Sequence, residues 1–199
     1  MQVPLLYETW QKLLRYDQMV GIGKIARRYF VVNAFDGTLT VMGLILGSWL
    51  AGVQDAAVVL KTGYSTALAI GVSGMWGAYM TEAAERRDDL IQLSRQTLTD
   101  LRDTDHWRAT RTATIIVAVV NGLSPSLAAS FVLIPFFFVY LLEEISWCYC
   151  MATLLAFTSL FVLGVLLGRV SGEKHLLSGI KMLAAGVVIA ALSYLIGRI

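Results

Sequence analysis

Charged side chains are scarce in this chain of 199 residues. Asp, Glu, Lys and Arg together make up 15% of the sequence, whereas an ordinary soluble domain has about 25%. Hydrophobic residues make up 57%, and the mean hydropathy is +0.67. This composition excludes an ordinary soluble domain and predicts an integral membrane protein. Because the basic residues lie where membrane topology requires them, the formal net charge of +2 indicates no nucleic-acid partner.

Cysteine and histidine are also rare, with two residues of each type. Cys148 and Cys150 are separated by a single residue, and this spacing makes a disulfide between them geometrically awkward. We therefore expect both cysteines to serve packing. No histidine lies within an apolar run, and no nucleophile has a plausible base beside it. The sequence predicts neither an enzyme nor a bound cofactor.

Long apolar runs fill most of the chain, and four of them match the roughly 20 residues that cross a bilayer. A shorter fifth run is extended by Lys181, whose ammonium can reach the headgroups. The runs are too long for barrel strands, so we predict an all-α, polytopic membrane protein with five transmembrane helices. The expected helices cover residues 29–53, 63–82, 111–141, 146–168 and 176–197 of one membrane domain, 29–199, with a helical cytoplasmic extension at 83–108.

Basic residues gather on one side of the predicted bundle. Only Lys61 and Arg198 fall on the other side. The positive-inside rule then places the N-terminus in the cytoplasm and the C-terminus outside, as five crossings require. A compact chain of this kind suits a prokaryotic cytoplasmic membrane. The basic residues on the cytoplasmic side are Lys12, Arg15, Lys24, Arg27, Arg28, Arg86, Arg87, Arg95, Arg102, Arg108, Arg111, Arg169 and Lys174.

The N-terminal segment, residues 1–28, interleaves apolar and charged side chains at near-helical spacing. One interpretation is an amphipathic helix lying on the cytoplasmic face of the membrane. The other is a solvated helix packed on the cytoplasmic loop. Neither interpretation gives this segment a chemical role.

Asp36 lies inside an otherwise uncharged stretch, 29–54. A carboxylate at that depth costs roughly 2.5–3.5 kcal/mol on insertion scales, so its default role is a site for an ion or a proton. This favours a transporter. The alternative is a non-transporting scaffold or regulatory protein, in which Asp36 caps a helix or forms an interhelical hydrogen bond.

Three acidic residues follow the second apolar run at spacings of three and four. Glu82, Glu85 and Asp89 would fall along one helical face and could share a cation. Alternatively, this is a solvated helix with ordinary ion pairs such as Glu82 with Arg86. In the third run, Pro125 and Pro135 could loosen the backbone and turn carbonyls toward a cavity, although neighbouring helices can also satisfy such carbonyls.

Several of these residues together resemble the vacuolar iron transporter family, over roughly residues 28–199. Their order and spacing carry the resemblance more than any single motif. The matching stretches are Asp36-Gly37, Ser73-Gly-Met75-Trp-Gly77-Ala-Tyr79 with Glu85, Asn121-Gly-Leu-Ser-Pro125, Leu133-Ile-Pro135-Phe and Tyr194-Leu-Ile-Gly197-Arg198.

The resemblance implies a homodimer that exports Fe²⁺, and sometimes Mn²⁺, from the cytoplasm in exchange for protons. Asp36 matches the family's first-helix aspartate, while the family's second-helix methionine falls on Gly74, one place before Met75. Met42 and Met80 are substitutes. The family's long cytoplasmic metal-binding region is shortened here to about thirty residues. Glu82 and Glu85 remain from it, which implies a reduced capture site.

Overall fold

The computed structural model describes residues 11, 14–19, 21–97, 104–142 and 144–198. Within these ranges the protein is all-α, and five helices are long and apolar enough to cross a membrane. The predicted fold class is therefore confirmed. The elements are α2 (Ile22–Leu50), α3 (Ala56–Thr97), α4 (Asp105–Leu133), η1 (Ile134–Phe138), α5 (Val139–Leu142), α6 (Ile145–Ser171) and α7 (His175–Ile196).

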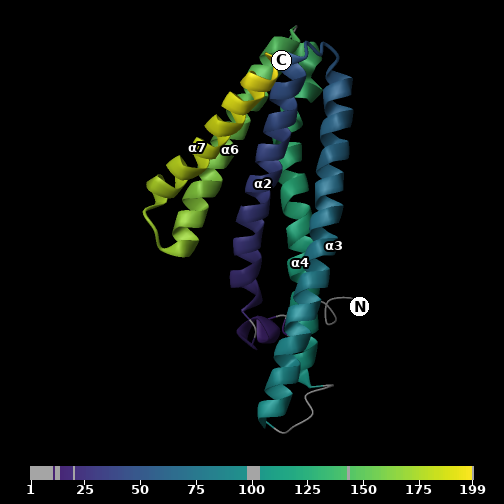
Figure 1. Ribbon diagram of the computed structural model, residues 1–199, viewed down its shortest axis with the longest axis vertical. Helices are drawn as coiled ribbons and strands as arrows, with labels where there is room; N and C mark the ends of the chain where they lie inside the picture. The colour runs from purple at the N-terminus through teal and green to yellow at the C-terminus, as the bar shows by residue number, and fades with distance from the viewer. Residues whose placement is uncertain (1–10, 12–13, 20, 98–103, 143, 199) are drawn as a thin grey trace.

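α2 is the central helix of the bundle. It packs against α4, α6, α7 and, less extensively, α3. α3 runs alongside α4, and these two helices project beyond the others at the end where α2 begins, while α6 and α7 form a hairpin that splays away from α2 at that same end (Figure 1). We call it the basic end, because Lys24, Arg27, Arg28 and Arg169 meet there around one hollow.

The main hydrophobic core lies toward the opposite end, where the helices converge. Val41, Met42 and Ile45 of α2 pack there with Leu133 and Tyr149, all nearly or completely inaccessible to solvent. The Tyr149 hydroxyl donates a 2.9 Å hydrogen bond to the backbone oxygen of Val53, and its ring meets Phe136 edge-on at 5.1 Å. This core holds the helices together at that end and leaves the basic end more open.

Glycines allow the closest helix crossings. A Cβ at Gly37 of α2 would collide with the backbone of Pro125 in α4. A Cβ at Gly164 of α6 would come within 2.7 Å of the Cα of Gly179 in α7. Small residues at such crossings let backbones pack directly in membrane helices, where lipid supplies no hydrophobic driving force.

The two prolines of the third span have different effects. Pro125 lies inside α4, which continues unbroken to Leu133. Pro135 stands in the first turn of η1, a 3₁₀ segment that interrupts the α-helix before α5. Only the second proline ends regular α-helix, since its missing N–H is tolerated at the start of a new helical segment.

α3 starts earlier than the expected residue 63, at Ala56, and runs without interruption to Thr97, into the residues expected as the helical extension. Residues 98–103 of the expected extension lie outside the described residues, as do 1–10, 12–13 and 20 of the N-terminal segment. In the described part of that segment, residues 14–19 are helical, and Arg15 pairs with Asp105 at the start of α4 at 3.2 Å.

Candidate ion path

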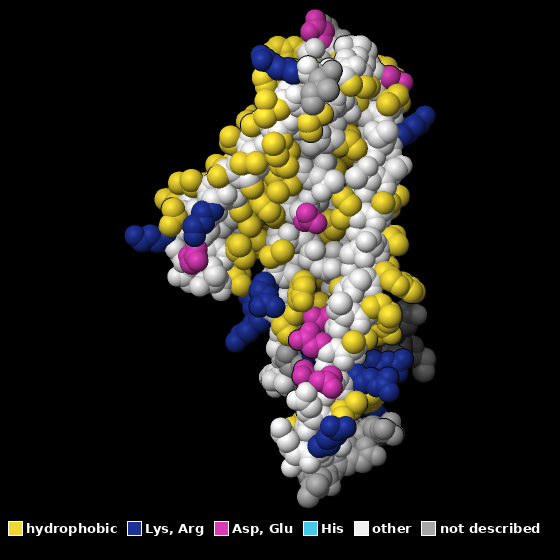
Figure 2. Space-filling view, in the orientation of Figure 1, with side chains coloured by type: hydrophobic (Ala, Val, Ile, Leu, Met, Phe, Trp, Pro, Cys, Tyr) yellow, Lys and Arg dark blue, Asp and Glu magenta, His cyan; other side chains and the backbone are white. Residues whose placement is uncertain are grey.

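A hollow of about 410 Å³ opens between α2, α3 and α4. Figure 2 shows an isolated acidic group within the largely hydrophobic face over these helices, well separated from the charged side chains nearer the ends. Four of the eight lining residues carry side-chain oxygens, and the other four are apolar residues or glycine. The lining residues are Asn33 and Asp36 of α2, Ala69, Ile70, Ser73 and Gly74 of α3, and Asn121 and Pro125 of α4.

Asp36 lies in the middle of α2, and its side chain is exposed at this hollow. Its backbone oxygen accepts a 2.9 Å hydrogen bond from the Thr40 hydroxyl. Its carboxylate makes no hydrogen bond or ion pair with any residue that the structure describes. Asp36 therefore neither caps a helix nor ties α2 to a described neighbour, and its carboxylate is available to a ligand.

Two asparagines form a polar bridge beside Asp36. The Asn33 amide donates to the backbone oxygen of Tyr29 at 2.7 Å and to the side-chain oxygen of Asn121. The Asn121 amide in turn donates to the backbone oxygen of Gly74 at 2.8 Å. This bridge joins α2, α4 and α3 at the wall of the hollow that Asp36 also lines.

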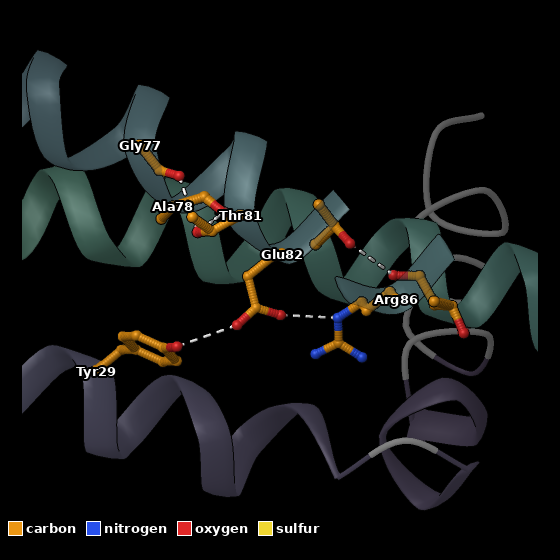
Figure 3. Close-up of polar contacts among 8 residues, drawn as sticks. Tyr29, Gly77, Ala78, Thr81, Glu82 and Arg86 are labelled. Carbon is orange, nitrogen blue, oxygen red and sulfur yellow. Dashed lines mark hydrogen bonds and ion pairs between the residues drawn. The ribbon is translucent and has the colours of Figure 1, made fainter. Parts of the chain in front are cut away.

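Toward the basic end, Glu82 links α3 to α2. Its Oε1 accepts a 3.1 Å hydrogen bond from the Tyr29 hydroxyl, and its Oε2 pairs with the Arg86 Nε at 2.8 Å. Figure 3 shows the carboxylate held between these two partners. The side chains of Glu82 and Arg86 are only 11% and 13% exposed. A buried charge paired in this way is expensive to uncover, because either partner alone would lose its compensation.

The other two acidic residues of the predicted helical face do not share the buried surroundings of Glu82. Glu85 and Asp89 are exposed, whereas Glu82 is buried. Among the residues that the structure describes, no three His, Cys, Asp or Glu side chains come close enough together to hold a metal ion. The structure thus places Glu82, Glu85 and Asp89 on one helix without gathering them into a preformed site, and it contains the Glu82–Arg86 ion pair of the alternative interpretation.

The three candidate methionines lie in different surroundings. Met42 is 1% exposed within the main core and does not line the hollow. Met75 is 39% exposed and packs closely against Gly122 of α4, while Met80 is 56% exposed. Gly74, where the resemblance would place a methionine, lines the hollow directly. None of the three thioethers belongs to the hollow's lining.

Comparison with known proteins adds to this geometry. Residues 95–198 match the VIT family. This chain belongs to the VIT family. It is also 29% identical over 179 residues to the uncharacterized protein MJ0645 of Methanocaldococcus jannaschii, a match that covers 88% of this chain and 91% of that protein. No solved structure matches the chain.

The VIT family match covers α4, α6 and α7, and with them one wall of the hollow, Asn121 and Pro125. It confirms the family expected from the sequence. Together with the five apolar helices, it makes the chain a multi-pass integral membrane protein.

Three residues of the site in this VIT family protein were not predicted from the sequence: Tyr29, Asn33 and Ser73. A signal for two of them was present, because Tyr29, Asn33 and Asp36 recur at spacings of four and three and so share one face of α2. The position of Ser73 depends on how α3 is turned toward α2, which a single apolar run does not specify.

Proposed function

We propose that this VIT family protein is a transporter that exports a divalent transition-metal ion, Fe²⁺ or Mn²⁺, from the cytoplasm in exchange for protons. The observation that carries the proposal is the Asp36 carboxylate, which lies halfway along a membrane helix, faces a hollow that three other oxygen-bearing side chains also line, and has no described partner. The membrane concerned is a prokaryotic cytoplasmic membrane.

The physical argument rests on the cost of an isolated charge in the bilayer. A carboxylate at mid-span is unfavourable by roughly 2.5–3.5 kcal/mol on insertion scales. Either a bound proton or a bound metal ion neutralises it, so the two compete for one group. If the site opens in turn to each side of the membrane, a metal ion can leave on one side only when a proton replaces it. Metal transport is thereby coupled to proton transport in the opposite direction.

The oxygens around Asp36 suit a metal that must also leave. Asn33, Ser73 and Asn121 supply neutral oxygen atoms at the same hollow. Oxygen ligands suit Mn²⁺ and bind Fe²⁺ more weakly than imidazoles do. Met75 or Met80 would add a softer ligand only after α3 rotates, because neither lines the hollow as it stands.

Entry to the path begins at the acidic face of α3. Glu85 and Asp89 are exposed and collect the ion, and Glu82 passes it toward Asn33 and Asp36. Glu82 can accept a cation only when the Arg86 guanidinium leaves its Oε2 atom. An arriving divalent ion supplies the replacement charge.

A homodimer completes the proposal. The hollow at Asp36 opens to the protein surface within one chain, and an open carboxylate at this depth would otherwise meet lipid. A second copy packed over this face would enclose the path. A non-transporting scaffold is the less favoured function, because its premise was an Asp36 engaged in capping or interhelical bonding, and no described residue partners it.

Proteoliposomes containing the purified protein test the proposal. We expect Fe²⁺ or Mn²⁺ uptake that depends on an imposed pH gradient and falls by at least about tenfold in Asp36→Asn, a variant of the same size without the charge. Asp88→Asn is the matched control, because Asp88 is exposed on the extension and bonds only Gln92 among described residues. Equal fluxes in the wild type and Asp36→Asn would reject transport through Asp36.

A further inference from the structure

A second hollow, of about 550 Å³, lies at the basic end between α2 and α6. Four of its lining side chains are cationic: Lys24, Arg27 and Arg28 from the first turns of α2, and Arg169 from the last turn of α6. Ile25 and Val170 complete the lining. Two chain segments more than a hundred residues apart thus bring four positive charges to one concave site.

These cations have no acidic partner among the described residues. The acidic side chains closest in sequence have other partners: Asp17 accepts a 2.6 Å hydrogen bond from the Gly23 backbone N–H, and Glu173 pairs with the Lys181 ammonium at 3.2 Å. Arg27 uses its Nε to donate to the Gly23 oxygen at 3.1 Å, which leaves the other four N–H donors of its guanidinium. Arg28 lies over the Tyr29 ring at 5.8 Å. Four like charges that are not neutralised repel one another, and a bound anion would relieve that repulsion.

The position of the hollow decides which anion fits. The apolar stretch of α2 starts directly after Arg28, and that of α6 ends directly before Arg169, so the four charges stand at the edge of the hydrocarbon layer. Further into the membrane, α2 and α6 come together at Val31, Leu163 and Leu167. The hollow is therefore closed on the membrane side by apolar side chains and opens where lipid headgroups lie.

We propose that this hollow binds the phosphate headgroup of an anionic phospholipid. Arg27, Arg28 and Arg169 offer planar N–H donors that match phosphate oxygens, and Lys24 adds a point charge. Basic pockets between membrane helices recognise lipid headgroups in this way. Val170, which is 47% exposed, provides an apolar edge along which the first part of an acyl chain can lie. The bound lipid bridges α2 to the splayed α6–α7 hairpin.

Lipid binding to the full chain in detergent provides the test. Phosphatidylglycerol should raise the melting temperature of the wild type, whereas phosphatidylcholine and inorganic phosphate should leave it unchanged. In the triple variant Lys24→Gln/Arg28→Gln/Arg169→Gln, the affinity for phosphatidylglycerol measured by native mass spectrometry should fall by about tenfold or more.

The matched control is Arg87→Gln/Arg95→Gln/Arg111→Gln, which removes the same charge from exposed positions of α3 and α4 at the same end. It should bind phosphatidylglycerol as the wild type does. An equal loss of lipid affinity in both triple variants would show that only net charge matters and would overturn the proposal. Equal stabilisation by inorganic phosphate and by the lipid would also overturn it. If the triple variant does not purify as a single species, Lys24→Gln and Arg169→Gln singly should each weaken lipid binding, and wild-type affinity in both would reject the site.

Discussion

At the scale of single residues, two carboxylates along the proposed path differ in their partners. Glu82 accepts a hydrogen bond from Tyr29 on one carboxylate oxygen and pairs with Arg86 through the other, whereas the Asp36 carboxylate makes no hydrogen bond or ion pair with a described residue. The first residue is thus stabilised in the absence of metal, and the second is not. In the proposed transport the pair would have a gating role, because it must open before an ion can bind Glu82.

Substitution of Arg86 tests the pair. Arg86→Met should lower the stability of the metal-free protein by about 1–3 kcal/mol, since Glu82 loses a charged hydrogen bond in a buried setting. Added Mn²⁺ should then raise the melting temperature of this variant more than that of the wild type, because no guanidinium has to be displaced. Thermal unfolding with and without Mn²⁺ measures both effects. Arg87→Met is the control at an exposed neighbour, and equal Mn²⁺ shifts in Arg86→Met and the wild type would contradict the gating role.

Glu173, in the turn between α6 and α7, has a pKa below its ordinary value. The main cause is the Lys181 ammonium, which donates to its Oε2 at 3.2 Å and adds a favourable charge; the Ser178 hydroxyl contributes further. Because folding lowers this pKa, the contact contributes stability above the pKa of the unfolded chain and loses it as the pH falls through the folded pKa. Lys181→Gln should raise the pKa of Glu173 toward its ordinary value, as an NMR titration of the Glu173 carboxyl would show. An unchanged pKa would exclude Lys181 as the cause.

At the scale of elements, the crossing of α2 and α4 at Gly37 and Pro125 sets the shape of the ion hollow. Pro125 touches Gly37 and also lines the hollow. A side chain at position 37 would push the two helices apart. The width of the hollow therefore depends on a residue that contributes no ligand.

Gly37→Ala should destabilise the protein by about 1–3 kcal/mol through overpacking against the Pro125 backbone. Gly77→Ala is the control, because a Cβ at Gly77 meets nothing within 4 Å. In a helix that change should be neutral or stabilising by up to about 1 kcal/mol. Chemical unfolding of both variants in detergent distinguishes the two sites, and equal stabilities would refute the close crossing.

The helices themselves could be predicted from the sequence, but the side of each helix that contacts its neighbours could not. Long apolar runs and the depth of Asp36 specify spans and a charged site, because lipid permits few alternatives. The partners of Glu82 depend on how α3 is rotated relative to α2. Similarly, Met42 shares α2 with Asp36 but packs in the core, and a list of methionines carries no information about which helical face is buried. For Pro125 the sequence left two alternatives open, a loosened backbone or carbonyls satisfied by neighbouring helices, and α4 continues through it to Leu133.

At the scale of the whole molecule, the distribution of charge predicts orientation. The basic end should face the cytoplasm, with the C-terminus on the other side. Cysteines introduced at Lys61 and Arg95, near the two ends of α3, lie about 50 Å apart along the helix axis. In a background with Cys148 and Cys150 replaced by alanine, a membrane-impermeant maleimide applied to intact cells should label position 61 and not position 95. The reverse pattern would invert the topology and the direction of transport.

α3 is a single helix of 42 residues without an internal proline. At 1.5 Å per residue it is about 63 Å long, roughly twice the thickness of the hydrocarbon layer. Ser73 and Gly74, which line the ion hollow, lie near its middle, and Asp89 lies toward its C-terminal end, beyond the apolar stretch. If such a helix tilted by about 10° around its midpoint, its tip would move by about 5 Å. A small change in tilt beside Ser73 would therefore become a larger displacement of the helix end outside the bilayer.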